Sequence, residues 1–162
     1  MLFVTVSSAQ AQYGRVTHVS PNEKLQVVIT PTYTHERGFH EHRVEVRTAT
    51  GKRLAVNDHS STDHEHGQGV IFASWTPDSR FFVYSVSSSG GHSAWHFPAY
   101  VFVRDRGAFF YLDELARPFV TPHFKLLPPN RFTSEALNDK GIDHPNVPVE
   151  LKLQDVKWPT DK

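Results

Sequence analysis

The residues Trp75-Thr76-Pro77-Asp78-Ser79-Arg80, followed by the apolar run from Phe81 to Val86, decide the fold. The same order of residue types occurs 56 residues earlier, in Val19-Ser20-Pro21-Asn22-Glu23-Lys24 and the apolar run that follows it. Proline sets φ for the second position of a type I turn, and Asn or Asp suits the next position because it bonds its own backbone. Each copy therefore predicts a strand, a tight turn and a second strand.

A second hairpin follows each copy. The loops Ala49-Thr50-Gly51 and Asp105-Arg106-Gly107 end on glycine, which suits the left-handed last position of a three-residue hairpin loop. In the first hairpin we expect three facing pairs, which are Thr48 with Lys52, Val46 with Leu54 and Val44 with Val56. The sequence thus predicts an all-β fold of two four-stranded antiparallel meanders packed as a sandwich. We expect the strands at residues 14–19, 25–33, 43–48 and 52–57, and at 70–75, 81–87, 99–104 and 108–112.

The rest of the chain is organised around the second unit. Its strands at 70–75 and 81–86 are apolar on both faces, which predicts a central sheet covered on both sides. Residues 113–162 are rich in proline, so we expect an irregular C-terminal extension. Within it, the residues predict a turn of helix at 134–138 and a half-buried strand over 147–153. The closing Trp158-Pro159-Thr160-Asp161 is similar to the turn at Trp75. An open alternative is therefore that the chain ends inside a third copy of the repeat.

The stretch from Trp75 to Ser85 resembles the blade signature of TolB-type and WD-like β-propellers, and the first copy resembles it more weakly. Glu23 and Ser79 stand where glycine is commoner in that signature. The resemblance implies that each unit is a four-stranded, blade-like meander. Two blades cannot close a propeller, which needs at least four, so we expect the two units to face each other.

Composition excludes several classes of protein. The 162 residues contain 17 Lys and Arg against 17 Asp and Glu, so no net charge would gather nucleic acid or an anionic membrane. The chain has no Cys, which excludes disulfides, Cys-ligated zinc and thiol catalysis. No apolar run approaches the ~20 residues of a membrane-spanning helix. The length supports one domain, which we place at residues 12–162 with repeat units 14–57 and 70–112 and the extension 113–162.

The first eleven residues predict a location. A short apolar stretch precedes Ala9-Gln10-Ala11, which is similar to the back half of a secretory signal peptide without its basic front. We therefore expect residues 1–11 to be a truncated signal-like segment, and the protein to be periplasmic or secreted. The alternative is an ordinary edge strand in the same residues.

The long connections predict a binding surface. Connections alternate between the two ends of a meander, so the short turns lie at one end and the long connections lie together at the other, which we call the long-loop end. Loops of this length beside such short turns are where function usually resides. The candidate binding residues lie in one of them and are Ser89, Gly90, Gly91, His92, Trp95 and His96. That loop has no Gly-x-Ser-x-Gly pattern and no orienting acid at a recognisable spacing, so we expect no catalytic residues.

The loop from Ser87 to Ser93, between two strands, is similar to the loop of periplasmic lysozyme inhibitors, in which Ser-Gly-x-Tyr enters the lysozyme cleft. Ser89 and Gly90 match that pattern, and His92 stands at the tyrosine position. The resemblance implies a protein partner. We therefore expect a non-enzymatic binding module that needs no cofactor.

A histidine-rich cluster leaves a second function open. Its members are His40, His42, Asp58, His64 and His66. In the expected register His42 faces Asp58, and His40 shares its face because strand residues two apart do so. Imidazole and carboxylate ligands could hold Zn²⁺, Cu²⁺ or Ni²⁺, which predicts a metal-binding protein or a metal-assisted hydrolase. The other explanation is a set of solvated histidines balanced by carboxylates.

Overall fold

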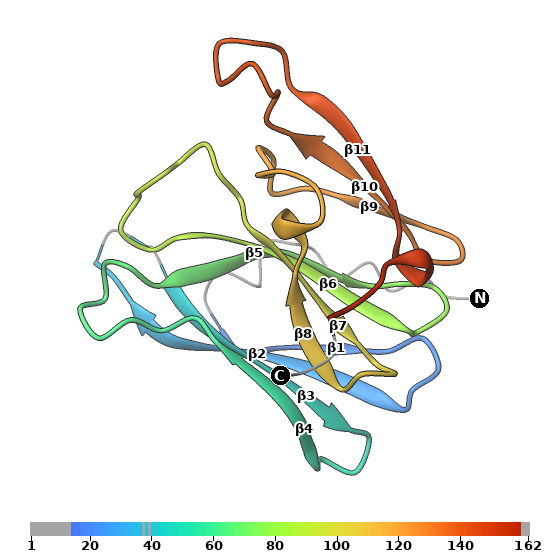
Figure 1. Cartoon of the computed structure of the whole chain (residues 1–162). Helices are drawn as coiled ribbons and strands as arrows, with labels where there is room; N and C mark the ends of the chain where they lie inside the picture. The colour runs from blue at the N-terminus through green and yellow to red at the C-terminus, as the bar shows by residue number, and fades with distance from the viewer. Residues whose placement is uncertain (1–13, 37, 39, 160–162) are drawn as a thin grey trace.

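The computed structural model describes residues 14–36, 38 and 40–159, and it shows three antiparallel sheets (Figure 1). The first sheet has the order β1 (Val16–Val19), β2 (Leu25–Thr34), β3 (His40–Thr48), β4 (Arg53–Asp58). The second has the order β5 (Gln68–Trp75), β6 (Phe81–Ser88), β7 (Ala99–Val103), β8 (Ala108–Tyr111). The third contains β9 (Lys125–Leu127), β10 (Arg131–Ala136) and β11 (Val147–Lys152). The short 3₁₀ turns η2 (Leu112–Glu114) and η3 (Leu153–Asp155) follow β8 and β11.

The all-β fold with two four-stranded meanders is thereby confirmed. Residues 1–11, which the sequence marks as signal-like, lie outside the described residues. Among the residues that are described, no helix is long and apolar enough to cross a membrane.

The two copies of the repeated turn are held by the same hydrogen bonds. Ser20 Oγ donates to the carbonyl of Leu25 and accepts its N–H, both at 3.0 Å. Thr76 Oγ1 makes the same pair of bonds to Phe81, at 3.2 and 3.1 Å. Ser79 closes its turn at a φ of 60°, the left-handed region where glycine is favoured. The repeat seen in the sequence is therefore a repeat of structure.

These turns also contact one another in series. The N–H of Asn22 donates to Ser79 Oγ at 3.0 Å, which joins the first turn to the second. Asn130 follows β9 in the third sheet, and its Nδ2 donates to Asp78 Oδ2 at 2.6 Å. One end of the molecule is thus a row of three linked turns.

The second sheet has a hydrophobic core on each face, as its strand pattern predicts. On one face it packs against the first sheet, and this core includes Val27, Ile29, Val44, Phe82, Tyr84 and Phe102. On the other face it packs against the third sheet and its flanking segments, through Phe81, Val101, Phe119, Phe132, Leu153 and Trp158. Truncating a buried Phe in such a core costs about 3–5 kcal/mol.

The C-terminal region, which the sequence indicates to be irregular, contains the three strands of the third sheet. The strand expected at 147–153 is confirmed as β11, but the turn of helix expected at 134–138 is wrong, because β10 continues to Ala136. Pairing of Phe132 with Leu151 and of Ser134 with Val149 overrides the local preference for helix. Trp158 does not begin a new strand within the described residues; its ring packs against Phe110 at 5.2 Å between centroids.

A β-bulge corrects the expected register of the β3–β4 hairpin. The turn itself forms as expected, with the N–H of Thr48 donating to the carbonyl of Lys52 at 2.9 Å. Beyond it, the register shifts between Val46 and Arg47, so that Val46 faces Ala55 and not Leu54. One residue more on β4 is accommodated at the bulge, and every later pair moves by one. Arg43 therefore faces Asp58 in place of His42.

Candidate functional site

Two long connections meet strand β3 at the carboxylate of Glu41, near the start of that strand. This side chain is completely buried. Ser61 donates to it twice, from its N–H to Oε2 at 3.0 Å and from Oγ to Oε1 at 2.6 Å. Ser89 Oγ donates to Oε1 at 3.0 Å. His64 Nδ1 lies 3.5 Å from Oε2. One acidic side chain therefore joins β3 to the loops on either side of β5 and β6.

Hydrogen bonding keeps this buried carboxylate charged. Burial alone raises the pKa of Glu41, but the donors from Ser61 and Ser89 outweigh it, so the pKa lies below its usual value. The site is also closed sterically, because a Cβ at Gly67 would lie 2.2 Å from Glu41 Cδ. The Glu41 junction, as we call Glu41 with Ser61, His64, Gly67 and Ser89, is thus a charged and tightly packed anchor.

The loop from 88 to 98 leaves this anchor at Gly90, where a second close approach occurs. A Cβ at Gly90 would lie 2.3 Å from the backbone oxygen of Glu65, in the neighbouring loop. We therefore expect Gly90→Ala to lower the free energy of unfolding by about 1–3 kcal/mol, the usual cost of overpacking. Urea denaturation would measure this loss. Gly14→Ala is the matched control, because nothing lies within 4 Å of a Cβ there, and equal stability of the two variants would contradict the prediction.

Beyond the anchor, the loop forms one wall of a recess of about 250 Å³ at the long-loop end. The recess is lined by His66, Gly67, Gln68, Ser88, His92, Ser93, His96, Pro98 and Tyr111. The rings of His66 and His92 stack in parallel, with centroids 5.3 Å apart. Trp95 stacks on His96 at 5.3 Å and is 41% exposed. The recess is therefore an imidazole-rich pocket with an exposed indole beside it.

His96 is held in place by an acid that the sequence did not indicate. Its Nε2 lies 2.7 Å from Asp113 Oδ2, and Asp113 comes from η2, after β8. The same carboxylate accepts the N–H groups of Ala99 and Phe119, at 2.9 and 3.3 Å. The Nε2–H of His96 therefore donates a hydrogen bond to Asp113, which fixes the orientation of the ring. The arrangement thus orients the His96 ring at the edge of the recess.

The six predicted binding residues divide into a buried root and an exposed tip. Ser89 is buried and donates to Glu41, so its hydroxyl faces the junction and not a partner. Gly90, Gly91, His92 and Trp95 are exposed, and His96 is half-buried under Trp95. The part of the loop that a partner can touch therefore runs from Gly90 to Trp95.

Comparison of the chain with known protein families finds no family that matches it, and comparison with curated proteins finds no matching relative.

The five predicted metal ligands are spread over four environments. His40 and His42 are buried on the same face of β3, with ring centroids 5.9 Å apart. Asp58 pairs with Arg43 at 2.9 Å, and the ring of His64 stacks on Tyr33 at 3.8 Å. His66 lies in the recess and bonds to Asp63. Within the described residues, no three His, Asp, Glu or Cys side chains are grouped to hold a metal ion.

His42 is part of the contact between the first and second sheets. The N–H of Val70 in β5 donates to its Nδ1 at 3.0 Å, so the proton of the neutral ring is on Nε2. Nε2 is buried and has no hydrogen-bond partner among the described residues. Burial, together with the nearby His40 and His59, lowers the pKa of His42 to about 4.

His59 lies in a second buried network between the same sheets. Its Nδ1 donates to Gln68 Oε1 at 3.1 Å, and its Nε2 accepts from the hydroxyl of Tyr84 at 2.9 Å. That hydroxyl in turn accepts from Asn57 Nδ2 at 2.7 Å. This arrangement suits a neutral imidazole, and burial lowers the pKa of His59 to about 4.

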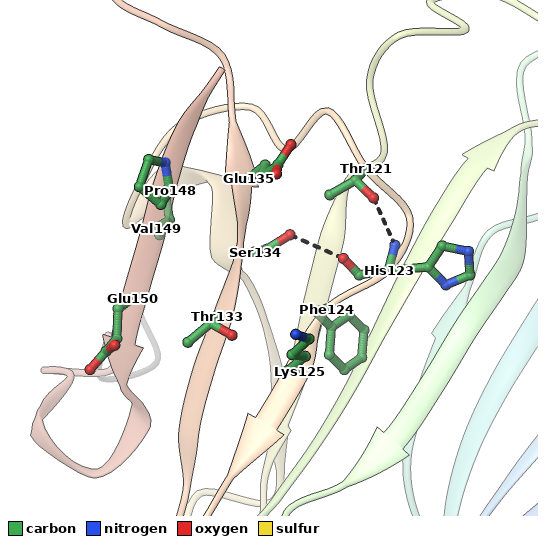
Figure 2. A pocket seen from close by; sticks show the side chains of 10 residues that line it. All are labelled: Thr121, His123, Phe124, Lys125, Thr133, Ser134, Glu135, Pro148, Val149 and Glu150. Carbon is green, nitrogen blue, oxygen red and sulfur yellow. Dashed lines mark hydrogen bonds between the residues drawn. The ribbon is translucent and has the colours of Figure 1, made fainter. Parts of the chain in front are cut away.

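A larger groove of about 700 Å³ lies over the third sheet and the segment that precedes β9 (Figure 2). Its lining mixes charged, hydroxyl and apolar residues, among them His123, Phe124, Thr133 and Glu150. Ser134 Oγ donates to the carbonyl of His123 at 3.3 Å, which joins β10 to the segment that precedes β9 (Figure 2). No predicted site residue lines it, so we place the candidate site at the long-loop recess.

Proposed function

We propose that the protein is a non-enzymatic binding module that recognises a protein partner with the tip from Gly90 to Trp95 and the adjoining recess. The observation that carries the proposal is the contrast between root and tip. The root of the loop is fixed by a buried charged junction, whereas the tip exposes an indole, an imidazole and glycine backbone. A surface held in one conformation before binding loses less entropy on association.

The composition of the tip fits a protein interface. An exposed Trp beside a recess is typical of the side chains that dominate binding energy at such interfaces. Glycine at 90 and 91 allows a partner's backbone to approach closely. His96, oriented by Asp113, offers a hydrogen-bonding nitrogen at the floor of the same recess.

We further propose that binding takes place outside the cytoplasm, in a periplasm or after secretion. The support is the Ala9-Gln10-Ala11 sequence after a short apolar stretch, together with the resemblance to lysozyme inhibitors. The coding sequence upstream of Met1 tests this. An in-frame basic segment and a longer apolar run support export, and an immediate stop codon contradicts it.

The binding proposal is tested with the Trp95→Ala variant. We expect at least about 30-fold weaker binding to a partner, the loss of about 2 kcal/mol that is typical of an interface hot spot. The biotinylated chain would be assayed by interferometry against a panel of lysozymes, and then against proteins captured from the culture of origin. Leu54→Ala is the control, because Leu54 is similarly exposed, at 44% against 41%, on β4 near the opposite end. A partner that binds both variants equally would contradict the proposed site.

Thermal melts separate this function from the metal-binding alternative. A ligand that binds only the folded state stabilises it by about 2.7 kcal/mol at 100 times its Kd. Melts with a chelator and then with Zn²⁺, Cu²⁺ or Ni²⁺ would reveal such a gain. Stabilisation by one of these ions that is lost in a His66→Ala, His92→Ala double variant would favour metal binding at the recess.

A further inference from the structure

The third sheet is an incomplete version of the other two. The turn before β10 occupies the same place in its unit as the turns before β2 and β6, and all three are linked by hydrogen bonds. By this correspondence β9, β10 and β11 match the first three strands of each complete sheet. In those sheets a fourth strand, β4 or β8, pairs with the third strand. Within the described residues, no strand pairs with the outer edge of β11.

The chain turns away where a fourth strand would begin. After β11 it enters η3, in which Leu153 is completely buried. Trp158 then packs against Phe81 and Phe110 of the second sheet. These contacts direct residues 153–158 into the core between the sheets, and away from the edge of β11.

A groove of about 450 Å³ follows this free edge. It is lined by the consecutive residues Val147, Pro148, Val149, Glu150 and Leu151, and on the other side by Leu115, Ala116 and Arg117. Successive residues of a strand point to opposite faces of its sheet. The groove touches residues of both faces of β11 and none of the neighbouring strand β10, which places it along the outer edge of β11.

The chemistry of the groove suits a strand with an apolar face. Val147, Val149 and Leu151 share one face of β11 and are only half-buried, and Leu115 opposite them is 39% exposed. The charged residues at the rim already have partners, because Arg117 pairs with Asp139 and Glu150 pairs with Arg131. The groove thus offers apolar side-chain contacts and backbone hydrogen bonds, and no unpaired charge from these two residues.

We infer that the free edge of β11 binds an extended segment of a partner protein, which adds to the third sheet as a fourth strand. The fitting segment carries apolar side chains at every second position, facing Val147, Val149 and Leu151. The occupant follows from the molecule itself, because β4 and β8 fill the corresponding place in the two complete sheets. Backbone pairing of this kind provides affinity, and the alternate side chains provide selectivity. This surface is separate from the long-loop recess, since the two share no lining residue.

A peptide with the sequence of residues 104–113, which contains β8, is a suitable probe. Labelled with fluorescein, it would be titrated with the full chain and followed by anisotropy. We expect saturable binding, and at least about tenfold weaker binding for a peptide N-methylated at alternate residues, because its methylated amides can no longer donate to the edge of β11. Equal binding of the two peptides would overturn the inference.

Hydrogen exchange would locate the bound peptide. Every second amide of an edge strand points away from its sheet, so amides of β11 should exchange quickly in the free protein and slowly with the peptide bound. Protection of β3 or β7 instead would mean that the peptide replaces β4 or β8, and would overturn the inference. Slow exchange of all β11 amides in the free protein would also overturn it, because the edge would already be occupied.

The side-chain contribution is tested with Leu115→Lys, which changes an exposed residue of the groove. We expect at least about tenfold weaker peptide binding with an unchanged melting temperature. Leu54→Lys is the matched control, since Leu54 is comparably exposed on β4. Equal loss in both variants, or in neither, would overturn the assignment of the peptide to this groove.

Discussion

Glu41→Ala is expected to lower the free energy of unfolding by about 3–5 kcal/mol, because it removes the acceptor of three hydrogen bonds and leaves a cavity in a packed site. The variant leaves the N–H and hydroxyl of Ser61 and the hydroxyl of Ser89 without their acceptor. Each buried donor that loses its partner costs about 1–3 kcal/mol, and the cavity left by the side chain adds to the loss. Urea denaturation monitored by tryptophan fluorescence would measure the change.

A second variant separates charge from shape at this position, and a substitution at Glu65 is the control. Glu41→Gln keeps the volume and one acceptor oxygen, so we expect a loss of about 1–3 kcal/mol. Glu65→Ala removes an exposed carboxylate at the same end of the molecule and should change stability by less than about 0.5 kcal/mol. If Glu41→Ala were no more destabilising than Glu65→Ala, the junction would not anchor the loops.

Acid is expected to destabilise the protein well before its exposed carboxylates are protonated. The pKa values of His42 and His59 are lowered to about 4, below the 6.5 of an unfolded chain. The unfolded state therefore binds these protons first, so the stability that the neutral rings contribute is complete above pH 6.5 and is lost as the pH falls toward 4. For shifts of this size each ring accounts for on the order of 2–3 kcal/mol by about pH 4.5. His18 and His40, whose pKa values burial also lowers, act in the same direction.

The measurement is the free energy of unfolding in urea at several values between pH 7.5 and 4.5. The His59→Gln variant is less stable at neutral pH but should lose less stability on acidification, because one of the two groups no longer titrates. His92→Gln is the control for the substitution itself, since His92 is exposed and lies outside both buried networks. A profile that stays flat down to pH 4.5 would contradict the buried, neutral state of both rings.

The turn chemistry explains why most of the fold could be predicted. Ser20 and Thr76 act within five residues of their own position, so their pattern is visible in a single sequence. The bulge in β3–β4 is different, because the position of an extra residue depends on packing between sheets. The same holds for β10, which is a strand because of its pairing with residues far along the chain.

The candidate site could be predicted only in part, for a related reason. Glycine and tryptophan in the 88–98 loop predict a binding surface by composition alone. Glu41 and Asp113 are single carboxylates whose roles arise from partners that are 48 and 17 residues away, at Ser89 and His96. Glu41 lies between His40 and His42 at the start of β3. In the sequence alone this pattern is typical of a solvated acid, whereas the structure buries the side chain.

The row of linked turns has a consequence for how this protein can vary. Because Asn22, Ser79, Asp78 and Asn130 tie the three sheets at the end opposite the recess, their mutual alignment does not depend on the tip from Gly90 to Trp95. Lengthening a surface loop costs little, about 0.6 kcal/mol for each doubling. Tips of new length and sequence can therefore be grafted between Gly90 and His96 on an unchanged framework, which makes the molecule a natural starting scaffold for libraries of recognition loops.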